Sequence, residues 1–168
     1  FGVVGIDEAL KLRKAGIKKP IINLGVYCNE DTDMLIKNNI IPSIFTKTDF
    51  ESFKNTAISN GDCAKIWLKI DTGLGRLGMP LNQVMSFVRF AASRNDIFVD
   101  GVYGALTEDI NFDKEQITKF ALIKKQCKRE GINILNWSIA SSEVVFLLED
   151  LLPNTVRLGI SLLGYYPS

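Results

Sequence analysis

The 168-residue chain contains no histidine. Imidazole therefore cannot act in it as a general base, a nucleophile or a metal ligand. Cysteine is also sparse, and Cys28, Cys63 and Cys127 are odd in number and widely spaced. That spacing offers no metal-ligand motif and is typical of free thiols in a reducing compartment. We therefore expect no metal site and reduced cysteines.

An excess of charge and long apolar runs are missing as well. The formal net charge is +1 and the lysines are scattered, so no basic field exists for nucleic acid or an anionic membrane. No apolar run approaches the roughly 20 residues that span a bilayer, and no signal peptide opens the chain. With 46% hydrophobic and 23% charged residues, the composition predicts one soluble, cytoplasmic globular domain that binds neither partner.

Short apolar runs alternate with amphipathic stretches along the whole chain. The pattern predicts seven strands, each but the last followed by a helix, at 1–5, 20–27, 40–45, 64–71, 97–104, 132–139 and 155–164. Strands joined by helices pair in parallel through right-handed crossovers, so the fold class is α/β. Such units fit either an open doubly wound sheet or a (β/α)8 barrel.

The first residue of the chain bears on the choice between an open sheet and a barrel. The chain begins at Phe1, inside an expected strand, rather than at a methionine. This favours a TIM-type (β/α)8 barrel over residues 1–168 that lacks its first βα unit.

Polar residues mark the expected starts of two helices. Thr48 or Asp49 is expected to cap the third helix, and Asp113 and Gln116 stand at capping-box spacing before the fifth.

Strand 64–71 carries a lysine among apolar residues. Because side chains alternate along a strand, Ile66, Leu68 and Ile70 are expected to face the helices and Lys69 the barrel interior. Arg157 takes the same inward position on the last expected strand. A cation placed there either belongs to a structural ion pair or serves a site at the C-terminal ends of the strands.

The segment "DTGLGRLG", residues 71–78, places Arg76 among glycines just beyond the lysine-bearing strand. Taken alone, Asp71 and Thr72 could form only a turn, and the glycines around Arg76 could be ordinary loop residues. Together, Lys69, Arg76 and Arg157 all lie at or beyond C-terminal strand ends, where a barrel builds its sites. Three cations at one mouth imply an anionic ligand.

A phosphate pocket is expected between the last two strands. Ser141 and Ser142 precede a short helix, whose first N–H groups together with a hydroxyl can bind phosphate. Gly159 and Ile160 follow Arg157 and can bring backbone N–H groups close to a ligand. The simpler interpretation of Ser142 is an ordinary helix cap.

Three segments resemble alanine racemase, a fold-type III enzyme that uses pyridoxal 5′-phosphate. They are "FGVVGIDEALKLRKAGIKKPIINLG", "LKIDTGLGRLG" and "VRLGISLLGYYPS". The resemblance covers nearly the whole chain in order. It implies a cytoplasmic homodimer that interconverts L- and D-alanine and supplies D-alanine for the cell wall.

The resemblance also implies roles for individual residues. Lys69 resembles the lysine that the family carbamylates, which would orient Arg76. Arg76 would bind the phenolic oxygen of the cofactor and the carboxylate of the substrate. Arg157 would face the pyridine nitrogen and keep it unprotonated, because a guanidinium stays charged. Ser142, Gly159 and Ile160 match phosphate-binding positions, and Ser141 stands in the family's neighbouring position.

The sequence departs from the family pattern in several places. The Schiff-base lysine and the tyrosine base of the family lie before Phe1 and after Ser168, the latter in a C-terminal β-domain, so no catalytic base is expected in this chain. Ala105 replaces a histidine, and Leu162-Leu163-Gly164 replaces "L-Y-G". We therefore expect the 168-residue chain by itself to lack racemase activity.

Three other hypotheses remain open at this stage. The chain could belong to a pyridoxal-phosphate-binding barrel without turnover, or to a racemase of another amino acid. A related fold-type III decarboxylase is less favoured, because it is not expected to pair Lys69 with "DTGLGRLG". An incomplete barrel also leaves unpaired strand edges, which predicts either an open, association-prone sheet or a partner segment that fills the gap.

Overall fold

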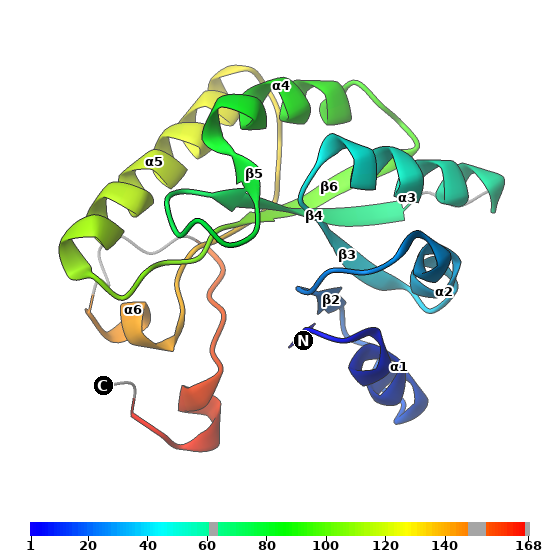
Figure 1. The fold of residues 1–168 in the computed structure, drawn as a ribbon, viewed down its shortest axis with the longest axis horizontal. Coiled ribbons are helices and arrows are strands. Elements are labelled where there is room, and N and C mark those ends of the chain that lie inside the picture. The colour runs from blue at the N-terminus through cyan, green and yellow to red at the C-terminus, as the bar shows by residue number, and fades with distance from the viewer. Residues whose placement is uncertain (61–63, 148–153, 167–168) are drawn as a thin grey trace.

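A computed structural model shows one curved sheet of parallel strands with helices along its outer side (Figure 1). The structure describes residues 1–60, 64–147 and 154–166. The sheet order is β1-β2-β3-β4-β6-β7, and the short β5 pairs with β4. The strands are β1 (Gly2–Val3), β2 (Ile21–Asn23), β3 (Ile40–Ile44), β4 (Ala64–Asp71), β5 (Met79–Pro80), β6 (Ile97–Tyr103) and β7 (Asn136–Ser138).

Helices separate most of the strands, as the alternation predicts. They are α1 (Ile6–Lys14), α2 (Thr32–Lys37), α3 (Lys47–Ser59), α4 (Leu81–Ala92), α5 (Ile110–Arg129) and α6 (Ser142–Leu147), with 3-10 helices η1 (Asn29–Asp31) and η3 (Ile160–Leu163). Within the described residues the sheet does not close on itself, since β1 pairs with β2 alone. The expected α/β fold, a partial TIM-type barrel, is confirmed. Whether the open sheet associates stays a prediction.

Apolar side chains pack on both faces of the central strand β4. On the outer face, Ile66, Leu68 and Ile70 are fully buried in the main core with the helices. On the inner face, Trp67 belongs to a separate small cluster with Ile41 and Tyr103. The alternation predicted for β4 is therefore correct, and it places Lys69 on the inner face.

A β-bulge in β6 sets the register at the functional end of the sheet. Ile66 pairs with Val99 and Trp67 with Gly101, so Asp100 is the extra residue. Its carboxylate accepts a hydrogen bond of 3.0 Å from Trp67 Nε1. Beyond the bulge Lys69 pairs with Tyr103, and Tyr103 pairs in turn with Ser138 on β7.

The predicted helix starts of α3 and α5 are wrong. Thr46, not Thr48 or Asp49, caps α3, and Asp49 completes the capping box from its N3 position. Asp109 caps α5 by accepting hydrogen bonds from two backbone N–H groups. Asp113 and Gln116 are instead buried inside α5. In both helices an earlier polar residue captures the first free N–H groups.

The last expected strand, 155–164, is also wrong. Residues 155–158 run beside β7, where Thr155 N donates to Trp137 O at 3.1 Å and Arg157 N to Ala140 O at 3.0 Å. The chain then turns into η3, which ends at Gly164 with φ of 82°. The sequence also predicts a short helix at 142–151, and its final residues lie outside the described residues.

No helix among the described residues is long and apolar enough to cross a membrane.

Candidate functional site

Three side chains form a row across the inner face of adjacent strands. Lys69 on β4, Tyr103 on β6 and Ser138 on β7 are register partners near the C-terminal ends of their strands. All three are buried. Arg157 lies beside β7 and extends this row, because its guanidinium bonds to Ser138. The C-terminal end of the sheet therefore holds the polar interior that the sequence predicts.

Lys69 is a buried cation without an acidic partner. Its side chain is 5% exposed, and it forms no ion pair with any described carboxylate. Its Nζ lies 5.6 Å from the centroid of the Tyr103 ring. Burial lowers the pKa of Lys69, and the charges of Arg76 and Arg157 lower this pKa further, against a smaller opposing effect of Asp71. A structural ion pair, the simpler hypothesis for Lys69, is absent from the described residues.

Replacing Lys69 by methionine is expected to stabilise the fold near neutral pH, because it removes a buried charge that two guanidinium groups repel. The folded chain binds fewer protons than the unfolded chain between the lowered pKa of Lys69 and its ordinary 10.5. Wild-type stability therefore rises with pH as the pH approaches 10.5 from below, and K69M loses this slope. Urea unfolding of wild type and K69M from pH 7 to 10 in CO2-free buffer measures this dependence of the free energy of unfolding on pH.

Lys65 offers the matched control for this prediction. It lies on the same face of β4, but its side chain is 59% exposed. K65M should keep the wild-type dependence on pH. A K69M variant with the same slope as K65M would contradict the assignment of Lys69 as a buried, unpaired cation.

Arg157 is held entirely by uncharged groups. Its Nη1 donates to Ser138 O at 3.1 Å and to Ser138 Oγ at 2.9 Å, and its Nη2 donates to Gly104 O at 2.7 Å. The guanidinium carbon lies 5.1 Å from the centroid of the Tyr103 ring. Burial lowers the pKa of Arg157. Within the part of the chain that the structure describes, no carboxylate neutralises the charge of Arg157.

Tyr103 lies next to both interior cations. Both approach its ring within the range of a cation–π contact. The phenol donates to Ser43 Oγ at 2.8 Å, and that hydroxyl donates to Asn23 O at 2.6 Å. Burial raises the pKa of Tyr103. The ring is thus anchored across the sheet and stays neutral.

The glycine-rich loop after β4 is folded around Asp71. Its carboxylate accepts hydrogen bonds from Gly73 N at 3.0 Å and from Gly75 N at 3.1 Å. Gly78 has φ of +135°, and a Cβ there would lie 2.8 Å from the backbone of β4. The loop therefore needs glycine to fold back on the strand. It presents the exposed Arg76 close enough to lower the pKa of Lys69.

The residues expected to bind phosphate lie together, at the start of α6 and of η3. Ser142 is buried, and its Oγ accepts a hydrogen bond of 3.0 Å from Gly159 N. Having accepted that bond, the hydroxyl still has its own proton to donate. Ser141 precedes it and is half-buried, and Ile160 is half exposed as the first residue of η3. Ser141 follows Ala140, which bonds Arg157 N, and Ser142 bonds Gly159, two residues after Arg157, so both serines lie beside the segment that carries Arg157.

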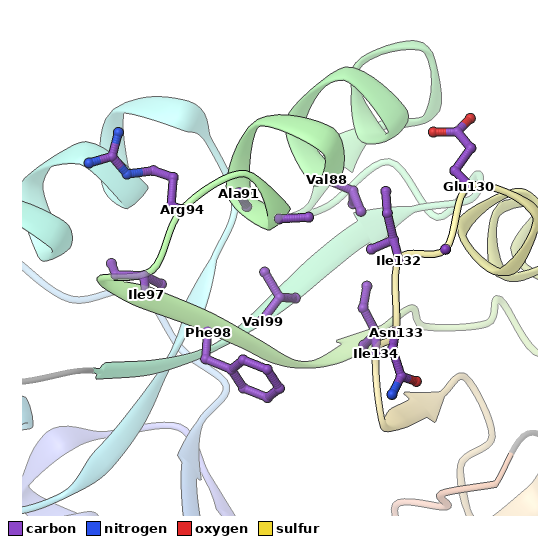
Figure 2. Close-up of a pocket in the computed structure, with 12 residues that line it drawn as sticks. Val88, Ala91, Arg94, Ile97, Phe98, Val99, Glu130, Ile132, Asn133 and Ile134 are labelled. Atoms are coloured by element: carbon purple, nitrogen blue, oxygen red, sulfur yellow. The ribbon is translucent and has the colours of Figure 1, made fainter.

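A cavity of about 420 Å³ lies at the other end of the strands (Figure 2). It is bounded by the end of α4, the start of β6 and the connection before β7. Its two charged side chains already have partners, Arg94 with Asp96 and Glu130 with Arg89. With its charges neutralised and its other walls mostly apolar, this cavity offers little to hold an anion. The cation-rich end is the better candidate site.

Comparison with known proteins decides the family. The family model described as "Alanine racemase, N-terminal domain" matches residues 1–167. The chain belongs to this family. It is 31% identical over 172 residues to the alanine racemase of Carboxydothermus hydrogenoformans, covering 100% of this chain and 46% of that protein. The chain thus spans about half the length of the curated relatives it matches.

Solved alanine racemases have the same fold. The enzyme from Clostridium difficile 630 superimposes with a TM-score of 0.92 and 26% identity, over 99% of this chain and 45% of that chain. The enzyme from the D-cycloserine producer Streptomyces lavendulae gives a TM-score of 0.91 and 26% identity, over 99% and 46%. These relatives are isomerases, so the family assignment inferred from the three segments is confirmed.

Sequence reasoning assigned no role to the uncharged members of this candidate site. Ser138 and Ser43 belong to no motif that we singled out. Tyr103 stands in the segment Tyr103-Gly104-Ala105-Leu106, which we compared with "Y-T-H-F" of the family only for the histidine that Ala105 replaces. For Tyr103 the bulge at Asp100 explains this, because alternation counted from Ile97 and Val99 would have placed the ring on the outer face. Of the cysteines, Cys28 and Cys127 are free, and Cys63 lies outside the described residues.

Proposed function

We propose that the protein to which this chain belongs is a pyridoxal 5′-phosphate-dependent alanine racemase that interconverts L- and D-alanine. The observation that carries the proposal is the cation set Lys69, Arg76 and Arg157, gathered at one end of a family-typical barrel. Among the described residues neither Lys69 nor Arg157 has an acidic partner. We further propose a cytoplasmic homodimer that supplies D-alanine for the cell wall.

The residues of the site fit a phosphorylated pyridine. Ser142 retains a hydroxyl proton for a phosphate oxygen, and a Cβ at Gly159 would meet nothing within 4 Å, so its backbone is open to a ligand. Ser141 and Ile160 would complete the phosphate end. Arg157 would face the pyridine nitrogen. The cofactor, when bound, would supply an electron-withdrawing ring that acidifies the Cα–H bond of alanine.

Arg76 and Lys69 would act at the substrate end of the site. Arg76 would bind the substrate carboxylate and the phenolic oxygen of the cofactor. The lowered pKa of Lys69 favours the neutral amine, which can react with CO2 to form R–NH–COO⁻ and one released proton. The modified side chain would be an anion that accepts hydrogen bonds from Arg76 and neutralises the excess positive charge.

The proton transfers themselves need groups from outside these residues. In our proposal residues 1–168 form the cofactor-binding barrel portion, and the lysine and tyrosine bases and the β-domain come from flanking sequence. Isolated as a 168-residue species, the chain is then expected to bind but not to racemise. Detectable alanine racemisation by that species would contradict the assignment of the two bases.

The test is a racemisation assay on the longest open reading frame that encodes this chain. With L-alanine and pyridoxal phosphate, D-alanine should accumulate, and R76Q should reduce kcat/KM about a hundredfold, because a positioned charge at the reacting centre is lost. R89Q, an arginine paired with Glu130 on the surface, is the matched control. Turnover of another amino acid alone, or none with both bases present, would replace the proposal by the other-substrate or non-catalytic alternative.

A further inference from the structure

Gln116 on α5 connects two loops of the candidate site through its side-chain amide. It is fully buried in α5, and its Nε2 donates to Thr72 Oγ1 at 3.0 Å and to Ala105 O at 3.2 Å. Thr72 begins the loop that carries Arg76. Ala105 follows Gly104, whose carbonyl accepts a hydrogen bond from Arg157. A single amide group therefore spans the loops that place both arginines.

Neighbouring residues of α5 contact the same loops. Asp113 is buried, and its Oδ1 accepts hydrogen bonds from Thr107 N at 2.8 Å and from Thr107 Oγ1 at 2.9 Å. The ring of Phe112 lies against Gly73, where a Cβ would come within 2.7 Å of its Cζ. The first turns of α5 thus contact the loop after β4 and the loop after β6 together.

The chemistry of glutamine suits this bridge. One amide nitrogen has two N–H donors, and here the two acceptors belong to different loops. The Oε1 atom of Gln116 is buried without a hydrogen-bond partner among the described residues. Such an orphan acceptor is unfavourable, so any favourable contribution of this amide comes from the two bonds that its nitrogen donates.

We propose that Gln116 is a positioning residue, which fixes the Arg76 loop relative to the loop that supplies an acceptor to Arg157. It touches neither arginine and acts through Thr72 and Ala105. The kinetic part of the proposal rests on the proposed racemase function. The structural part, coupled ordering of the two loops, does not.

The experiment compares Q116M, T72V and the double variant in the full reading frame. Amide hydrogen exchange at Gly73, Gly75 and Thr107 reports the two loops, since all three N–H groups are hydrogen bonded in the structure. Q116M should accelerate exchange about tenfold in both loops and leave α4 unchanged. It should also raise the KM for alanine about tenfold, with kcat changed much less.

Two further comparisons separate positioning from general destabilisation. T72V and Q116M should be non-additive in KM, because they break the same hydrogen bond. Q116E keeps the shape, and its carboxylate can accept a hydrogen bond from the Thr72 hydroxyl in place of the one that Gln116 Nε2 donates. It cannot donate to Ala105 O, so exchange at Thr107 should rise more than at Gly73. Q126M, on the exposed side of α5 where Gln126 bonds Glu130, should match wild type.

The outcomes are distinct. Unchanged exchange in either loop of Q116M, or additive effects with T72V, would overturn the proposal. If Q116M does not fold, the contrast between the loops in Q116E decides it. If wild-type protein does not racemise any amino acid, the proposed function fails, and the exchange measurements alone decide the role of Gln116.

Discussion

Replacing Arg157 by lysine is expected to destabilise the fold by about 3 kcal/mol and to lower kcat/KM for alanine at least a hundredfold. The guanidinium reaches two acceptors on Ser138 and one on Gly104 at once. A lysine ammonium is a single point of charge and cannot meet all three in this geometry. Gly104 O would then lose this donor, and Ser138 O would keep only the bond that it accepts from Gly104 N. A buried acceptor left without its donor costs about 1–3 kcal/mol.

The control for this variant is another arginine that makes forked hydrogen bonds. Arg89 donates through Nε and Nη2 to Glu130, both at 2.7 Å, on the surface. R89K should reduce the free energy of unfolding much less than R157K does, because water can replace the hydrogen bonds that Arg89 donates at the surface. Urea unfolding of both variants measures the difference. Equal losses would show that the acceptors around Arg157 do not depend on a guanidinium.

Replacing Gly78 by alanine is expected to destabilise the fold by about 3 kcal/mol or more. The φ of +135° is strained for any residue with a side chain, and the new Cβ would lie 2.8 Å from Asp71 N and from Ile70 C. These atoms belong to the backbone of β4 and cannot rotate away. The loop would have to move, and Arg76 with it, so we also expect kcat/KM to fall.

Gly75 in the same loop provides the comparison. Its φ is +71°, but a Cβ there would meet nothing within 4 Å. G75A should therefore cost only about 1–2 kcal/mol, the ordinary penalty of a left-handed residue. Thermal or urea unfolding of G75A and G78A separates the cost of a positive φ from the cost of the contact between the new Cβ and the backbone of β4. If G78A is no less stable than G75A, the close approach of the loop to β4 is not what demands glycine.

The inner face of β4 was predictable because alternation along a strand is local. It placed Lys69 inside from its immediate neighbours, and the structure agrees. Arg157 was assigned to the right face on a wrong strand, since residues 155–158 keep an extended course beside β7 without extending to 164. An extended backbone alternates its side chains whether or not it pairs over its full length.

The groups that hold Arg157 could not be predicted from the sequence. Its acceptors lie 19 and 53 residues away, at Ser138 and Gly104, and two of the three are backbone carbonyls that any residue type would supply. The role of Gln116 was hidden for a similar reason. Its spacing from Asp113 matched a helix start, while its contacts depend on how two distant loops pack on α5.

Arg157 donates its hydrogen bonds to groups that do not change their protonation state between pH 5 and 8. An imidazole at position 105 or 138 would become charged in that range and would repel the guanidinium. A serine hydroxyl, two peptide carbonyls and a tyrosine ring keep the same charge throughout. Moderate acidification would therefore leave the charge of these protein groups around Arg157 unchanged.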